Sequence, residues 1–416
     1  MKSYRLFLAG LLCLSLLLTS AIPTPAVSEA LSYIEIYSSY LGGDGYDEMR
    51  DVAFDVNGNL ILVGGTVSGG PDTHIAFPTT QGVVQPQHNP LVNPDGVNNM
   101  DMFVAKLDAQ GKLIWSTFLG GPCFDKAYAV ETDRQGYIYI AGRAGCQFPH
   151  ISPDAFQPQF MGGWSGAYGN QDGILLKLSP DGSQVIWASY FGTSEANALR
   201  DIDLDEYRNI YVIGGLQPGS SVSPSIAAGL NRGYRSTPYG DNDEIVAKIS
   251  PDGRQVLWAS LLGGSGFEQN SGSLRVASDQ TVFTLTTTNS SDCPTVNAYD
   301  TTYNGGWDSY LARLSADGKN LLFATYVGGK GDDFAAGTHN LWIDLQGNPV
   351  FSGSTHSPDY PVSKSAFQPT YGGGASGTIE TDGDLFVTII SSVGKRLVAG
   401  TYLGGSRGDG AAEGIT

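Results

Sequence analysis

A short apolar strand that ends in a glycine pair recurs six times along this chain, and no other feature restricts the fold as strongly. Successive copies lie 65–78 residues apart, and they are SSYLGG (38–43), WSTFLGG (115–121), ASYFGT (188–193), ASLLGG (259–264), ATYVGG (324–329) and GTYLGG (400–405). A period of this length indicates one supersecondary unit that is copied along the chain. We therefore expect a repeat architecture in which each copy ends one unit.

Each interval between two copies contains two β-hairpin patterns. The first pattern has two β-rich runs around an Asp, Asn and Gly turn and covers 50–66, 126–143, 200–215, 273–288 and 339–355. The second runs into the next glycine pair and covers 101–121, 172–192, 243–264, 308–329 and 384–405. Two hairpins make a four-stranded antiparallel unit, whose strands we name A, B, C and D in chain order.

Repetition of such a unit predicts an all-β fold, a β-propeller of four-stranded antiparallel blades, with five full blades plus partial N- and C-terminal blade strands. A solenoid is disfavoured because its repeats are usually 20–45 residues long. The predicted full blades are 44–119, 122–191, 194–262, 265–327 and 330–403, and the partial strands are 34–41 and 406–416. Strands B and C of the shared blade are missing, so we expect a piece of a longer protein with an open or strained seam.

The glycine pair and the bulky residues before it have predicted structural roles. The crossing from strand D to the next strand A should need φ > 0 and close backbone approach, both of which glycine allows. The aromatic residues before the pair should pack between sheets, as should three tryptophans three residues further upstream: Trp115, Trp187 and Trp258.

The first thirty residues have the order of a secretory signal. Lys2 and Arg5 precede an apolar run from Leu6 to Leu18, and small residues follow with Ala at 21, 26 and 30. The run is too short to span a bilayer, so residues 1–30 are predicted to be a signal peptide cleaved near 21–30. This pattern predicts a secreted or cell-surface protein without membrane insertion.

The formal net charge of −18 disfavours nucleic acid as a partner, because phosphate backbones require cationic patches. Solubility outside the cell is a sufficient reason for such a charge.

The repeat pattern resembles the SBBP family of bacterial β-propeller repeats. The resemblance covers about 34–416 and includes the middle stretches FPTTQGVVQP (77–86), FPHISPDAFQP (148–158), CPTVNAYDTTYNGG (293–306) and YPVSKSAFQPTYGGG (360–374). The third blade lacks a clear F-P-T stretch, and the fourth lacks the hairpin Gly. The resemblance implies a secreted or cell-surface setting, often within a larger multidomain chain, and it supplies no catalytic residues.

Metal and catalytic patterns are weak. The five histidines lack zinc-ligand spacing and no G-x-S-x-G elbow occurs, so we assign no catalytic residue and no cofactor. Calcium is the open alternative, because loops after the glycine pair carry carboxylates that could bind it at one face: Asp44, Asp47, Asp332 and Asp333. The LDAQGKLIW stretch (107–115) resembles a quinoprotein docking repeat, but its spacing changes in later blades.

The segments that join strands B and C differ in length and are rich in aromatic residues. In a propeller these B–C segments and the D–A crossings emerge on the same face, where variable loops on a rigid scaffold form a recognition surface. The candidate ligand-binding residues are Trp164, Tyr168, Tyr239, Tyr303, Trp307 and Tyr371. We therefore predict a non-catalytic binding or adhesion module for an extracellular glycan or protein. The alternative is a propeller enzyme acting on polysaccharide or a small molecule.

Three cysteines remain after the signal, and two of them are predicted to form a disulfide. Cys123 lies just before strand A of the second blade and Cys146 just after strand B, so both should meet at the loop-bearing end of these neighbouring strands. Closing this loop should stabilise the fold by roughly 3 kcal/mol. Cys293 is predicted to be a small buried apolar residue, and two unpaired thiols are the alternative to the disulfide.

Overall fold

The structure is a computed structural model that describes residues 38–70, 72–91, 93–335, 337, 339–374 and 383–409. Its compact unit begins at Ser39. The predicted signal peptide lies outside the described residues. Among those that are described, no helix has the length and apolar character needed to cross a membrane.

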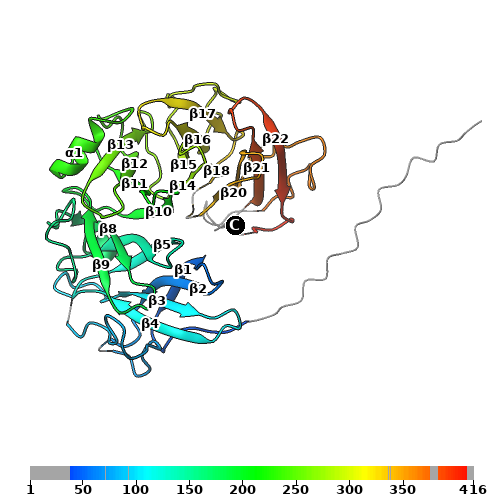
Figure 1. The fold of residues 1–416 in the computed structure, drawn as a ribbon. Helices are drawn as coiled ribbons and strands as arrows, with labels where there is room; N and C mark the ends of the chain where they lie inside the picture. The colour runs from blue at the N-terminus through cyan, green and yellow to red at the C-terminus, as the bar shows by residue number, and fades with distance from the viewer. Residues whose placement is uncertain are drawn as a thin grey trace, which may run out of the picture. The chain divides into compact units, whose positions relative to one another are not determined.

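Five antiparallel sheets follow one another in chain order, and we number them 1 to 5 (Figure 1). Their first strands are β1 (Asp47–Phe54), β5 (Lys126–Thr132), β10 (Leu199–Leu204), β14 (Ser273–Val276) and, in sheet 5, the separate pieces β18 (Asp333–Phe334) and β19 (Leu341–Ile343). Their second strands are β2 (Leu60–Thr66), β6 (Ile138–Ala144), β11 (Ile210–Leu216), β15 (Val282–Thr288) and β20 (Pro349–Thr355).

The third strands are β3 (Asp101–Leu107), β8 (Asn170–Leu178), β12 (Asp243–Ile249), β16 (Asp308–Leu314) and β21 (Asp384–Ile390). The fourth strands are β4 (Leu113–Leu119), β9 (Val185–Phe191), β13 (Val256–Leu262), β17 (Leu321–Val327) and β22 (Leu397–Leu403). Each predicted pair of hairpins is therefore confirmed as one four-stranded antiparallel unit. A two-residue strand, β7 (Gly163–Trp164), adds to sheet 2 beside β8.

The turn of the first hairpin has the same backbone conformation in all five sheets. Its key residue has φ between 63° and 81°, and it is Gly58, Gly136, Arg208, Gln280 or Gly347. The aspartate that opens the turn accepts backbone N–H bonds, as Asp55 does from Asn57 and Asn59 at 2.8 and 2.9 Å. Asp205 makes the same bonds around Arg208. In sheet 4, Ala277 takes the place of that aspartate, and Asp279 accepts the N–H of Thr281 at 3.1 Å beside Gln280.

Tryptophans of the fourth strands pack between sheets, as predicted. The Trp187 indole of sheet 2 donates to the carbonyl of Pro251 in sheet 3 at 3.3 Å. A Cβ added to Gly253, which has φ 69°, would lie 2.5 Å from the Trp187 ring, so the glycine turn is flush against the indole. Trp115 and Trp258 make the equivalent bonds to the next sheet.

The prediction for the repeated glycine pair was half wrong. Of the six first glycines, Gly263 alone has φ in the left-handed range, so backbone conformation is not the common reason for glycine. Close approach is the reason. A Cβ on Gly120 would lie 2.2 Å from a carboxylate oxygen of Asp101, and a Cβ on Gly192 would lie 1.9 Å from one of Asp172. Both aspartates lie in the first residues of the third strand.

These aspartates anchor the B–C segments. Asp172 is buried and accepts the backbone N–H of Met161 at 2.7 Å, and Asp384 accepts that of Gly372 at the same distance. Sheet 3, which lacks the F-P-T stretch, instead carries the helix α1 (Pro224–Leu230), which packs on β13.

The structure describes only part of each predicted partial strand. Residues 38–41 are described and form no strand, and the same is true of 406–409. The rest of both segments, 34–37 and 410–416, lies outside the described residues.

Candidate functional site

A cavity of about 290 Å³ opens between sheets 2 and 3, at the end of the sheets that carries the B–C segments and the D–A crossings. We call this end the loop face. Two predicted ligand-binding residues, Trp164 and Tyr168, line the cavity and are 58% and 37% exposed. The other lining residues include Phe267, the amides Asn197, Gln217, Asn242 and Asn270, and the guanidinium groups Arg143 and Arg200.

β-bulges in the first strands aim three side chains at one point beside this cavity. The pairing register shifts at the same place in β1, β5 and β10, and the extra residues at these bulges are Arg50, Tyr128 and Arg200. A bulge re-aims the side chain of its extra residue. The guanidinium carbon of Arg200 lies 4.4 Å from the centre of the Tyr128 ring, and that of Arg50 lies 5.3 Å from it.

Arg143, near the end of β6, completes this arrangement. Its guanidinium carbon lies 5.3 Å from the Tyr128 ring and 4.3 Å from the Tyr168 ring. Burial alone would raise the pKa of the Tyr128 hydroxyl, but the positive charges of Arg143 and Arg200 lead the groups that together lower it. The cations around Tyr128 therefore create a positive potential inside an acidic protein.

The predicted disulfide between Cys123 and Cys146 is confirmed, with Cα atoms 5.8 Å apart, and it supports the wall of the cavity. Phe124, next to Cys123, packs against Tyr168 with tilted rings whose centres are 4.9 Å apart. The disulfide therefore restrains Phe124, which packs behind Tyr168 in the cavity wall. Cys293 is free and buried, as predicted.

The remaining predicted aromatic residues do not line this cavity. Tyr239 is exposed. Trp307 packs between other rings, 5.8 Å from Phe334 and 6.3 Å from Phe267. Tyr303 and Tyr371 pack on the strand tyrosines Tyr326 and Tyr402, respectively. These contacts give Trp307, Tyr303 and Tyr371 a packing role, and their predicted ligand contacts stay a prediction.

The predicted calcium-binding aspartates bind their own loops. Asp47 accepts the N–H of Gly43 at 2.8 Å, and Asp333 likewise accepts that of Gly329 at 2.6 Å, so each closes a D–A crossing. Asp44 accepts from the N–H of His74, and Asp332 from that of Trp307. Within the described ranges, no three His, Cys, Asp or Glu side chains are grouped as a metal site would require, and calcium stays a prediction.

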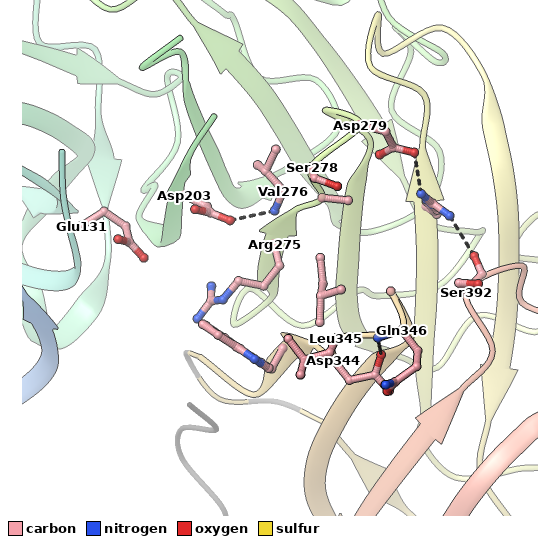
Figure 2. Close-up of a pocket in the computed structure, with 15 residues that line it drawn as sticks. Glu131, Asp203, Arg275, Val276, Ser278, Asp279, Asp344, Leu345, Gln346 and Ser392 are labelled. Atoms are coloured by element: carbon pink, nitrogen blue, oxygen red, sulfur yellow. Dashed lines mark hydrogen bonds and ion pairs between the residues drawn. The ribbon is translucent and has the colours of Figure 1, made fainter. Parts of the chain in front are cut away.

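A larger cavity of about 700 Å³ lies at the opposite end, which carries the A–B hairpin turns and which we call the turn face (Figure 2). Its lining includes Glu131, Asp203 and Arg275 from the first strands, and the turn residues 344–347. The side chain of Asp203 accepts the backbone N–H of Val276 at 2.7 Å. This bond joins sheet 3 to sheet 4 at the edge of the cavity.

Two carboxyl groups of the turn-face cavity have raised pKa values. Burial raises the pKa of Glu131 to about 8, and the nearby Asp203 adds to this shift. Burial also raises the pKa of Asp203 to about 6, although Arg275 opposes it. Glu131 and Asp203 titrate as a pair, and burial makes the pair hold its protons to a higher pH than exposed carboxyl groups would.

His339 ties sheet 5 to sheets 1 and 3. Its Nδ1 lies 3.1 Å from Asp201 Oδ1, and its Nε2 lies 3.4 Å from Asp51 Oδ2. Burial lowers the pKa of His339, but Asp201 and Asp51 outweigh burial and raise it to about 9. The imidazole is therefore positively charged at neutral pH and acts as a bridge between first strands.

Sequence reasoning identified Trp164 and Tyr168 but missed the arginines that share their cavity. A signal was present, because Arg50-Asp51 and Arg200-Asp201 occupy the same place in their repeats. Nothing in the sequence shows that a bulge turns these arginines toward Tyr128.

No family model matches the chain. Among curated proteins, it is 26% identical over 277 residues to the regulatory protein FlaEY of Caulobacter vibrioides. The match covers 60% of this chain and 26% of FlaEY, so the chain spans about a quarter of that protein's length.

Among solved structures, a Dyadobacter fermentans protein of unknown function aligns at 12% identity and TM-score 0.37, covering 85% of this chain and 94% of that one. The quinohemoprotein alcohol dehydrogenase of Comamonas testosteroni aligns at 10% identity and TM-score 0.38, covering 87% and 62%. The mannose phosphorylase MPT-4 of Leishmania mexicana aligns at 10% identity and TM-score 0.31, covering 76% and 84%.

Proposed function

We propose that this chain is an exported β-propeller of SBBP-type repeats that recognises an extracellular ligand through its loop face, without catalysis. The observation that carries the proposal is the loop-face cavity, where Trp164 and Tyr168 of one B–C segment meet residues of sheet 3. Partly exposed aromatic faces beside amide side chains suit sugars and peptides, because they combine apolar stacking with hydrogen bonding.

Two further observations support export. The N-terminal residues have the order of a secretory signal, and the disulfide Cys123–Cys146 is of the kind that persists in oxidising compartments. The test is to express the whole chain with its leader and to sequence the N-terminus of the secreted product. We expect cleavage between residues 21 and 30, and retention inside the cell with an intact leader would contradict export.

Binding is tested with an array of glycans and matrix polymers, probed with the secreted chain and with two tryptophan variants. Trp164→Ala removes the exposed ring of the loop-face cavity. Trp342→Ala is the matched control, because Trp342 is 44% exposed and lines the turn-face cavity. We expect Trp164→Ala to weaken binding at least tenfold and Trp342→Ala to leave it unchanged, and the reverse result would move the site to the turn face.

The second candidate is an enzyme that acts on polysaccharide or a small molecule. It is favoured by the Glu131 and Asp203 carboxyl groups, because carboxyl groups in a cavity whose pKa values burial raises toward neutral suit acid–base chemistry. Purified wild-type chain and Glu131→Gln are incubated with the polymers that bind. Turnover that is lost in Glu131→Gln would establish the enzyme, whereas binding without turnover supports recognition.

A further inference from the structure

Two of the four cations around Tyr128 have a carboxylate partner and two do not. Glu48 accepts from Lys126, and it accepts from Arg50 at 2.8 Å. Among the described residues, neither Arg143 nor Arg200 is paired with a carboxylate, and both have a buried Nε atom without a hydrogen-bond partner.

The Arg143 side chain is buried. Its residue is 6% exposed, and burial together with the nearby Arg200 lowers the pKa of its guanidinium. Two like charges held close together in low dielectric are unfavourable unless an anion lies between or beside them.

An acid near Arg200, Glu244, is a poor source of that anion. Glu244 interacts with the charge of Arg200, but it is 1% exposed, and burial raises its pKa well above its ordinary value. Burial therefore disfavours the charged form of Glu244. The Tyr128 ring gives the guanidinium groups a π face, which attracts a cation more weakly than a formal charge does.

The other residues that line the cavity indicate the chemistry of the rest of the ligand. Trp164 and Phe267 offer partly exposed ring faces, and four amide side chains line the same space. Asn270 Oδ1 is buried there without a hydrogen-bond partner. Rings and amides together match the apolar face and the hydroxyl groups of a sugar.

We infer that the loop-face cavity recognises an acidic saccharide, whose carboxylate or sulfate group is bound by Arg143 and Arg200 while its ring stacks on Trp164. This inference rests on the proposed recognition function and names the ligand class of the same site. Guanidinium groups suit both anions, since their paired N–H groups match two oxygens of a carboxylate or sulfate.

The test compares three probes on the full secreted chain by titration calorimetry: an oligogalacturonide, a sulfated galactose oligosaccharide and a neutral galactose oligosaccharide of equal length. We expect an acidic probe to bind at least tenfold more tightly than the neutral one. Raising the salt concentration from 0.05 to 0.5 M should weaken only the acidic probes. The difference between the two acidic probes identifies the anion.

Two variants separate this inference from the function on which it rests. Arg200→Gln should remove the preference for the acidic probe, and Trp164→Ala should weaken acidic and neutral probes alike. Arg254→Gln is the matched control for loss of one positive charge, because Arg254 is exposed and pairs with Asp154 outside the cavity. Arg200→Lys, which keeps the charge, should recover part of the preference if the glutamine variant folds poorly.

Binding of the neutral probe through Trp164, with no preference for acid and no effect of Arg200→Gln, overturns the inference and leaves recognition standing. Failure of all three probes to bind overturns the acidic-saccharide inference directly. Failure of every polymer on the array is the separate result that overturns the recognition function.

Discussion

The contact between Trp187 of sheet 2 and the Gly253 turn of sheet 3 gives the sharpest test of how the sheets are held together. Trp187 is 7% exposed and donates its indole N–H to Pro251. Trp187→Ala should therefore destabilise the fold by about 3–5 kcal/mol, as expected for a large aromatic side chain removed from a core. Trp187→Phe keeps a ring but loses the hydrogen bond, which should cost about 1 kcal/mol plus a small packing loss.

Gly253 supplies a coupled perturbation. In Gly253→Ala the new Cβ would lie 2.5 Å from the Trp187 ring, and at φ 69° the backbone would also be strained by about 1–2 kcal/mol. In the Trp187→Ala background the collision disappears and only the backbone strain remains. Gly253→Ala should therefore lower the free energy of unfolding less in the Trp187→Ala background than in the wild type.

The assay is urea denaturation, followed by circular dichroism, with the disulfide intact. It compares the wild type, Trp187→Ala, Gly253→Ala and the double variant, and Trp187→Phe is measured beside them. Trp164→Ala serves as the control, since its side chain is 58% exposed and its loss should change stability by less than about 1 kcal/mol. Additive effects of Trp187→Ala and Gly253→Ala, within about 0.5 kcal/mol, would refute the packing argument. So would equal losses of stability in Trp164→Ala and Trp187→Ala.

Three further predictions concern other parts of the fold. Gly192→Ala, whose Cβ would lie 1.9 Å from Asp172, should destabilise the fold by about 1–3 kcal/mol in the same urea denaturation assay. Gly405→Ala, with no atom within 4 Å of its Cβ, should leave stability nearly unchanged. The pKa of His339 is raised to about 9, so its stabilisation is complete below pH ~6.5 and is lost as pH rises through 9; His339→Gln should flatten that loss in thermal melts from pH 6 to 10. Trp307→Ala should lower the melting temperature, because Trp307 packs on two rings, and an unchanged melt would restore its predicted role in binding.

Much of the scaffold could be predicted because its signals are local. The hairpin turns carry an aspartate whose hydrogen bonds fix the turn, so the strand order within each sheet is readable from spacing. The disulfide between Cys123 and Cys146 was predictable for the same reason, since neighbouring antiparallel strands bring their ends together. Which backbone feature requires glycine was not readable, because the colliding group at Gly120 is the carboxylate of Asp101, and the direction of that side chain is set by the packed sheet.

The candidate site likewise has parts that the sequence predicts and parts that only the structure shows. By itself the sequence determined a four-stranded repeat, a face with aromatic loops, and the presence of Trp164 and Tyr168 on it. Only the tertiary structure decided that these two share a cavity while Trp307 packs against other rings. It also decided that bulges in separate strands bring Arg200 toward Tyr128. The physical reason is that strand pairing follows from local patterns, whereas charges and rings of different sheets meet only when the sheets pack.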